Sequence, residues 1–192
     1  MSSVLDDYDV TASAVERLIR RAGKDDWDKP TPCTDWSVRG LVNHIVRGNL
    51  MLSSIMLGEP APDRSLDHLG DDPAEAYRAS VHRFRDAAAA PGALEQRFPT
   101  PLGEQSGRFL VHMRINELLV HGWDLARALG LPPDDLPDGL AEEGLAMWRE
   151  RMAAVPRGKE GPFATEQPAP PDASPIDRLA AFLGRRLDWP AT

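Results

Sequence analysis

Residues 114–124 read RINELLVHGWD, one of the most apolar stretches of the chain, and they place Glu117 and His121 four positions apart. In a helix, positions i and i+4 lie about one turn apart on one face, so this carboxylate and this imidazole point the same way. At about 100° per residue from Glu117, His121 falls at about 40° and Asp124 at about −20°. The spacing therefore predicts a helix whose inward face carries an acid and an imidazole among apolar side chains.

The Glu117–His121 pair has two explanations. It can be a simple charge pair, or it can be part of a metal site. A buried carboxylate without a partner is costly, which favours the metal. One more imidazole from a neighbouring helix would complete a ligand set of two nitrogens and one oxygen, which holds a divalent ion such as zinc and leaves positions open to a substrate. His112 falls at about −140°, on the far side of the same helix, and is a poor third ligand.

His44 is the better candidate for the second imidazole. It lies on a helix predicted to begin after the N-cap Ser37 and to end near Leu57, and its i−4 and i+4 neighbours are Gly40 and Gly48. Two glycines inside a helix cost about 1 kcal/mol each relative to alanine, so they need a local reason. They can clear space around His44 for a metal and a substrate, or they can permit close helix packing. Both explanations stay open at this point.

Helical spacing runs through most of the chain, and no convincing alternating strand is found. We expect helices at about 6–22, 37–57, 72–90, 104–129, 138–154 and 174–187, with a loop at 58–72 and a long Pro-rich loop at 155–175. Long amphipathic helices joined by short loops are typical of helical bundles, which place metal sites between facing helices. The prediction is an all-α four-helix bundle with an additional short C-terminal helix, in a single domain spanning residues 1–192.

Composition removes several function classes. The 192 residues carry 22 Lys and Arg against 30 Asp and Glu, a formal charge of −8, without a run of basic residues interleaved with aromatics. A nucleic-acid partner is therefore not expected. The acidic start of the chain and the lack of a long apolar run predict a cytoplasmic protein without a membrane span. Cys33 is the single cysteine, which excludes an internal disulfide and a site with several thiolates.

Two motifs carry a resemblance to a known family. TPCTDWSVRGLVNH at residues 31–44 and ELLVHGWDLA at residues 117–126 together resemble the metal-binding domain of the mycothiol-dependent maleylpyruvate isomerase family, a branch of the DinB-like superfamily. The closing stretch PIDRLAAFLGRRLDW, residues 175–189, resembles a subgroup of single-domain members. The likeness therefore spans nearly the whole chain.

The resemblance implies a DinB-like four-helix bundle in which His44, Glu117 and His121 bind one divalent metal, usually zinc, with nickel or another ion as alternatives. It also implies the small-molecule thiol mycothiol as co-substrate, and an isomerase or transferase acting on a small electrophilic substrate. The chain is shorter than the isomerase and has no room for that enzyme's extra C-terminal domain, so the metal site carries over better than the reaction. The catalytic residues stay unassigned. The alternative is a non-catalytic metal-binding or structural bundle that acts through protein contacts or as a homodimer.

Two further side chains near these motifs have open roles. Asp124, three positions after His121, is the candidate to accept a hydrogen bond from the second ring nitrogen of His121. Its alternative is an ion pair with Arg127 or Arg114. Cys33 is more often expected as a buried small hydrophobe than as a nucleophile.

Overall fold

The computed structural model describes residues 3–100, 103–153, 158 and 164–189. Six α-helices occupy these residues, together with one 3₁₀ turn (Lys24–Asp26) and one pair of short strands. The helices are α1 (Val4–Arg21), α2 (Val38–Leu57), α3 (Pro73–Ala89), α4 (Gly107–Ala128), α5 (Asp138–Met152) and α6 (Pro175–Phe182).

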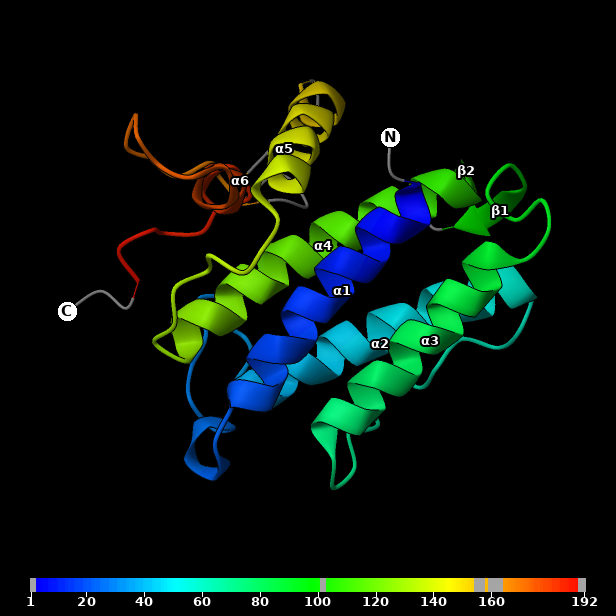
Figure 1. Ribbon diagram of the computed structural model, residues 1–192, viewed down its shortest axis with the longest axis horizontal. Coiled ribbons are helices and arrows are strands. Elements are labelled where there is room, and N and C mark those ends of the chain that lie inside the picture. The colour runs from blue at the N-terminus through cyan, green and yellow to red at the C-terminus, as the bar shows by residue number, and fades with distance from the viewer. Residues whose placement is uncertain (1–2, 101–102, 154–157, 159–163, 190–192) are drawn as a thin grey trace.

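Helices α1 to α4 form a four-helix bundle (Figure 1). α1 packs against α3 and α4, and α2 packs against the same two helices, so the four make a closed ring around one core. α5 and α6 pack on each other and lie on the other side of α4 (Figure 1). α4 is therefore covered on several faces, and sixteen of its residues are buried. The predicted all-α four-helix bundle is confirmed.

The helix ends follow the capping signals of the sequence. Ser37 is the N-cap of α2 and accepts a hydrogen bond from the amide of Gly40, as expected. Gly58 ends α2 with a φ of 68°, a left-handed conformation that glycine adopts without a steric penalty. Asp72 caps α3, and Pro73 takes its first position. These signals fix where α2 begins, and hence which face of α2 carries His44.

No convincing alternating strand was found in the sequence, but the structure contains one pair of short strands. Strands β1 (Arg97–Thr100) and β2 (Gly103–Ser106) pair antiparallel just before α4. As a result α4 begins at Gly107 and not near Glu104, with Ser106 as its N-cap. Each strand has only four residues, which is too short for an alternating pattern to stand out in the sequence.

A buried polar network joins the four helices of the bundle. Asn49 on α2 accepts hydrogen bonds from Tyr8 of α1 and from Arg114 of α4, and it donates one to Ser80 of α3. Asn49 and Arg114 are both fully buried. Buried polar groups that are all satisfied help to specify one arrangement of a core. This network sets the register of α4 against α2, which is the contact on which the candidate site depends.

α6 is shorter than expected and ends at Phe182, where Gly184 follows with a φ of 94°. The expected Pro-rich loop at 155–175 lies partly outside the described residues. Within it, residues 164–173 contain no helix or strand. None of the helices in the described ranges combines the length and the apolar character that crossing a bilayer requires.

Candidate metal centre

His44 of α2 and His121 of α4 come together between the two helices. Their ring centroids are 4.9 Å apart, with the ring planes at 76°. His121 is buried, whereas His44 is half-buried. Two positions 77 residues apart in the chain are thus brought into contact by the packing of α2 on α4.

Trp36 covers the two imidazoles. Its indole stacks on His44 at 4.2 Å between centroids and meets His121 edge-on at 5.9 Å. The turn before α2 holds it there, because the buried hydroxyl of Thr31 donates to the carbonyls of Cys33 and Trp36. The Thr-Pro-Cys-x-x-Trp segment therefore has a physical role in presenting an aromatic wall to the two histidines.

The two glycines of α2 make room for neighbours other than a metal. A Cβ at Gly40 would approach the Trp36 side chain closely, at 3.3 Å from its Cβ. A Cβ at Gly48 would overlap the guanidinium of Arg114. The sequence left open whether the glycines clear space for a metal or permit close helix packing. Gly48 permits close packing against Arg114, and Gly40 leaves space for the Trp36 indole that stacks on His44.

Glu117 lies one turn before His121, and its carboxylate is 38 % exposed. Its Oε2 accepts a hydrogen bond of 2.8 Å from Nη1 of Arg114. The other two guanidinium nitrogens of Arg114 donate to Asn49 and to the carbonyl of Ile45. Arg114 is thus fixed by three bonds in the core and holds one oxygen of Glu117 in place.

His121 is oriented by Asp124, as the i+3 spacing predicts. The distance from Nδ1 of His121 to Oδ2 of Asp124 is 3.1 Å. With Nδ1 engaged, Nε2 is the ring nitrogen that faces a ligand. The alternative ion pairs of Asp124 with Arg127 or Arg114 were wrong, because Arg185 from the chain after α6 is its partner, with contacts of 3.2 and 2.9 Å.

Electrostatics keep His44 neutral. Burial is the main cause that lowers its pKa to about 3, and the neighbouring His121, Arg114, Arg47 and Arg185 act in the same direction. A neutral imidazole is the form that binds metals. For Asp124, burial alone would raise the pKa, but the hydrogen bond from His121 and the charge of Arg185 outweigh it, so the pKa lies below its usual value. Asp124 is therefore a carboxylate that accepts from both neighbours.

The structure brings together part of the ligand set expected from the sequence. The imidazoles of His44 and His121 meet, and Asp124 stands behind His121. Glu117 lies on the adjacent turn, but its described hydrogen bond is to Arg114. Among the described residues, no group of three or more His, Cys, Asp or Glu side chains has an arrangement that could hold a metal ion. The set His44, Glu117 and His121 therefore stays a prediction.

Cys33 lies near the same cluster. It is half-buried, and burial raises the pKa of its thiol to about 11, with the negative charge of Asp124 as the next cause. A thiol with a raised pKa is a poor nucleophile at neutral pH.

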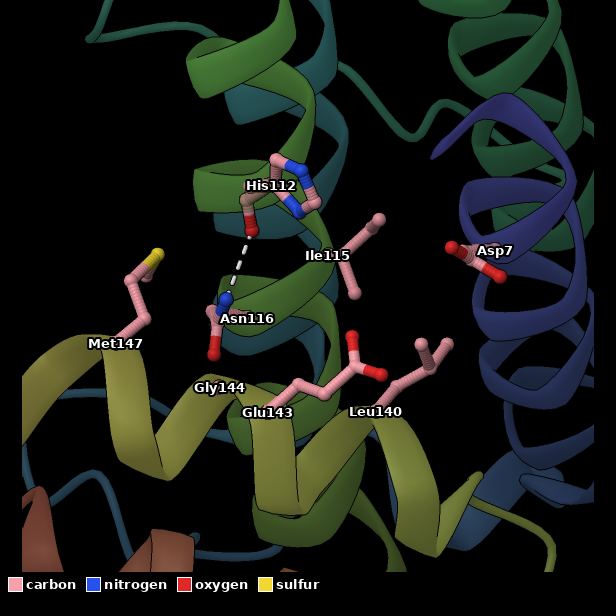
Figure 2. Close-up of a pocket in the computed structure, with 8 residues that line it drawn as sticks. All are labelled: Asp7, His112, Ile115, Asn116, Leu140, Glu143, Gly144 and Met147. Carbon is pink, nitrogen blue, oxygen red and sulfur yellow. Dashed lines mark hydrogen bonds between the residues drawn. The ribbon is translucent and has the colours of Figure 1, made fainter. Parts of the chain in front are cut away.

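His112 belongs to a different hollow, on another face of α4. Figure 2 shows it with Asn116 beside a pocket of about 260 Å³, lined also by Asp7 from α1 and by Glu143 and Gly144 from α5. The side-chain amide of Asn116 donates to the carbonyl of His112. Sequence geometry placed His112 away from Glu117 and His121, and the structure agrees.

Three residues of the site were not predicted from the sequence in these roles. Arg114 falls at about 60° from Glu117 on the helix, within the same stripe, so its contact with Glu117 could have been found. Trp36 directly precedes the N-cap Ser37, and that position alone indicates no contact with the two histidines. Arg185 is more than 60 positions from Asp124, and no local pattern joins them.

Comparisons with known proteins identify the relatives of this chain. Residues 9–126 match the sequence profile described as "Mycothiol maleylpyruvate isomerase N-terminal domain". Two uncharacterized proteins of Mycobacterium tuberculosis, from two strains, are each 36 % identical over 174 residues, which cover 91 % of this chain and 93 % of theirs.

Among solved structures, the crystal structure of the mycothiol-dependent maleylpyruvate isomerase is similar, with a TM-score of 0.62, 18 % identity, and coverage of 80 % of this chain and 73 % of that one. A histidine mutant of that enzyme gives a TM-score of 0.61 with the same coverage. This likeness shows the fold, and the profile match over more than half of the chain shows the family. The chain belongs to the mycothiol maleylpyruvate isomerase N-terminal domain family.

Proposed function

We propose that the protein is a metal-dependent enzyme that uses a small thiol, mycothiol, to isomerise or transfer groups on a small electrophilic substrate. His44, Glu117 and His121 are the proposed ligands of one divalent ion, zinc first among the candidates. Asp124 orients His121. Family membership supports the thiol and the isomerase chemistry, and the residues of the site support the ion.

The observation that carries the proposal is the meeting of the two imidazoles. Their ring centroids are 4.9 Å apart, and His121 has Nδ1 bound to a buried carboxylate, so that Nε2 is free for a ligand. A carboxylate behind a ligating histidine fixes the ring and raises its basicity. Glu117 adds an oxygen on the adjacent turn, and only its Oε2 is engaged by Arg114. The donor types fit zinc.

Each side chain has a role that follows from its position. A zinc ion at this place would lower the pKa of a bound thiol so that the thiol reacts as thiolate at neutral pH. Trp36 limits the access of water to His44 by stacking on its ring. Arg47 lies 3.4 Å from Nδ1 of His44, and because Arg114 and Arg185 are paired with Glu117 and Asp124, Arg47 is the side chain that makes the surroundings positive. Positive surroundings favour an anionic co-substrate such as a thiolate or a carboxylate.

Metal analysis of protein purified without added metal tests the ligand set. We expect about one ion per chain in the wild type, and a loss of most of it in His44→Ala and His121→Ala. His112→Ala is the matched control, because His112 lies on the same helix as His121 but in a different pocket. Unchanged metal content in His44→Ala and His121→Ala would remove the assignment.

Activity is measured in two assays with mycothiol as the thiol: isomerisation of maleylpyruvate, and conjugation to a bimane electrophile against a blank without protein. We expect activity in at least one of them, reduced about 100-fold or more in His121→Ala and unchanged in His112→Ala. No activity above the blank in either assay, with metal bound, would contradict the enzyme and leave a metal-binding protein.

A second candidate function, a structural or interaction bundle, has an observation in its favour. Trp36 stacks on His44, and Arg114 pairs with Glu117, so these groups have protein partners without an ion. For this candidate, metal analysis would give far less than one ion per chain. His121→Ala would then lower stability without changing any reaction.

A further inference from the structure

The two residues that follow the Glu117–Gly122 part of the motif both bind the C-terminal segment, defined here as residues 174–189. Nε1 of Trp123 donates to Oδ1 of Asp177, near the beginning of α6, at 2.7 Å. Asp124 accepts from Arg185, just after the end of α6. Adjacent residues of α4 thus hold the two ends of one short helix, and one of them also touches His121.

We propose that Arg185 is a positioning residue of the candidate metal centre: through Asp124 it fixes the His121 ring so that Nε2 faces the ion. This inference rests on the proposed function, because it assigns the role of a residue at that same site. The described hydrogen bonds of the Arg185 side chain go to Asp124 and Leu183, not to the imidazole, and Arg185 is not a proposed ligand of the ion. It acts through one buried carboxylate.

The first step of the argument is the geometry of the carboxylate. Asp124 is completely buried, and Arg185 donates Nε to its Oδ1 and Nη2 to its Oδ2. A two-point contact of this kind fixes the plane of the carboxylate as well as its place. Oδ2 is also the oxygen that lies 3.1 Å from Nδ1 of His121. Fixing Oδ2 therefore fixes the direction of the His121 N–H.

The second step is charge. A carboxylate with no exposed area is costly to bury unless a positive side chain lies beside it. Arg185 supplies that positive charge, with its Nη2 2.9 Å from Oδ2 of Asp124. A lysine would supply the charge as a point but could not reproduce the two-point contact. This difference separates a charge effect from an orientation effect.

The third step is that Arg185 is itself held at a defined place. Gly184 has a φ of 94°, and the amide of Arg185 donates to the carbonyl of Ala180, which closes the end of α6. Nη1 of Arg185 donates to the carbonyl of Leu183. The side chain therefore begins from a fixed backbone. It also lies outside residues 9–126, so a part of the chain beyond the matched family domain completes the site.

The experiment compares wild type, Arg185→Gln, Arg185→Lys and the control Arg186→Gln. Arg186 is the neighbouring residue, is 60 % exposed, and pairs only with Asp188 among the described ion pairs. Zinc affinity is measured by chelator competition, and the cobalt form is examined by visible spectroscopy. We expect zinc binding about 10- to 100-fold weaker in Arg185→Gln, an altered cobalt spectrum, partial recovery in Arg185→Lys, and wild-type behaviour in Arg186→Gln. A lowered melting temperature with zinc affinity within twofold of wild type would overturn the inference, because it describes a purely structural contact.

A second measurement does not depend on the metal. The nitrogen-15 NMR spectrum of the His121 ring in metal-free protein at pH 7 reports which ring nitrogen carries the proton. We expect the Nδ1–H form in the wild type and in Arg186→Gln, and a changed ring-nitrogen spectrum in Arg185→Gln. Identical spectra in wild type and Arg185→Gln would overturn the inference. If the wild type binds no metal but the spectra differ as expected, the proposed function fails while the positioning role stands.

Discussion

Arg114 and Gly48 show how one buried side chain dictates the residue opposite it. The Arg114 guanidinium is fully buried, and each of its three nitrogens donates a hydrogen bond. It occupies the space that a side chain at position 48 would take. Helix propensity alone disfavours a glycine in the middle of α2, but the buried guanidinium leaves no room there for a larger residue.

Replacing Gly48 by alanine should destabilise the protein, although alanine normally favours a helix by about 1 kcal/mol. The new Cβ would displace a guanidinium that has no free direction to move, at a net cost of about 1–3 kcal/mol. Denaturant unfolding measures the change. The control is Gly139→Ala in α5, where nothing lies within 4 Å of the new Cβ and a small gain in stability is expected. A gain in stability in Gly48→Ala as well would contradict this account.

The Cys33 thiol should react slowly for a cysteine that is only half-buried. With its pKa raised to about 11 by burial, the thiolate fraction at pH 8 is about 100-fold below that of an ordinary thiol of pKa 9.0. Alkylation by iodoacetamide should be about 100-fold slower than in the denatured chain and should still rise steeply between pH 9 and 10. A rate that is half-maximal near pH 9 would show an unperturbed thiol.

At the residue scale, the sequence predicted the contacts that lie within one helix. The i+3 step from His121 to Asp124 led to their hydrogen bond. The same reasoning applied to Arg114 and Glu117 would have found their ion pair. Arg185 was out of reach, because its place depends on how α6 docks on α4.

Helix boundaries were predictable to within a few residues wherever a cap residue or a glycine marks them, as at Ser37 and Gly58. The errors occurred where the local signal is weak. Glu104 and Gln105 were assigned to a helix, but pairing with residues 97–100 makes them a strand. The last helix ends at Phe182, since Gly184 turns the chain with a positive φ. Strand pairing decided the first of these boundaries, and the turn at Gly184 decided the second.

Asp177 should matter for α6 more than for the bundle. Its carboxylate accepts from Trp123, Arg127 and Ser174, so Asp177→Ala removes three hydrogen bonds at the beginning of α6. We expect a loss of about 1–3 kcal/mol in local stability. Relative to wild type, amide hydrogen exchange should become faster in residues 176–185 and change less in α1.

The control for Asp177→Ala is Glu142→Ala. Glu142 is 70 % exposed and reaches the same helix through Arg178 at 3.3 Å. Exposed ion pairs contribute little, so its effect should stay below about 0.5 kcal/mol. If the amides of α6 exchanged equally slowly in Asp177→Ala and in Glu142→Ala, the Asp177 contacts would not be what holds the helix.

For the whole molecule, helical periodicity was enough to predict an all-α bundle, because apolar stripes on several helices can be buried only against one another. It was not enough to say which helices are neighbours. The order is set by contacts such as Tyr8 and Arg114 on Asn49, which join three helices at one amide oxygen. Such a long-range polar contact has no signature in a single helix.

Asn49→Ala should therefore lower the stability of the entire bundle. It leaves the Tyr8 hydroxyl and Nε of Arg114 without their acceptor in a dry core, at a cost of about 2–4 kcal/mol. Hydrogen exchange should rise together in α1, α2 and α4, and denaturant unfolding should keep one transition. Asn43→Ala is the control, because Asn43 lies on α2 but bonds only to the loop residues Leu66 and His68. Faster exchange confined to α2 in Asn49→Ala would contradict a network that spans the bundle.

The two contacts that hold α6 on α4 fix the number of residues between them. Asp177 and Arg185 are eight positions apart and bind adjacent residues of α4, so the helical length between them is prescribed. Inserting one residue there would rotate Arg185 by about 100° and carry it away from Asp124. Over evolutionary time, insertions and deletions should accumulate in the preceding loop and avoid this interval. A homologue with an altered spacing should have exchanged its arginine or its aspartate as well.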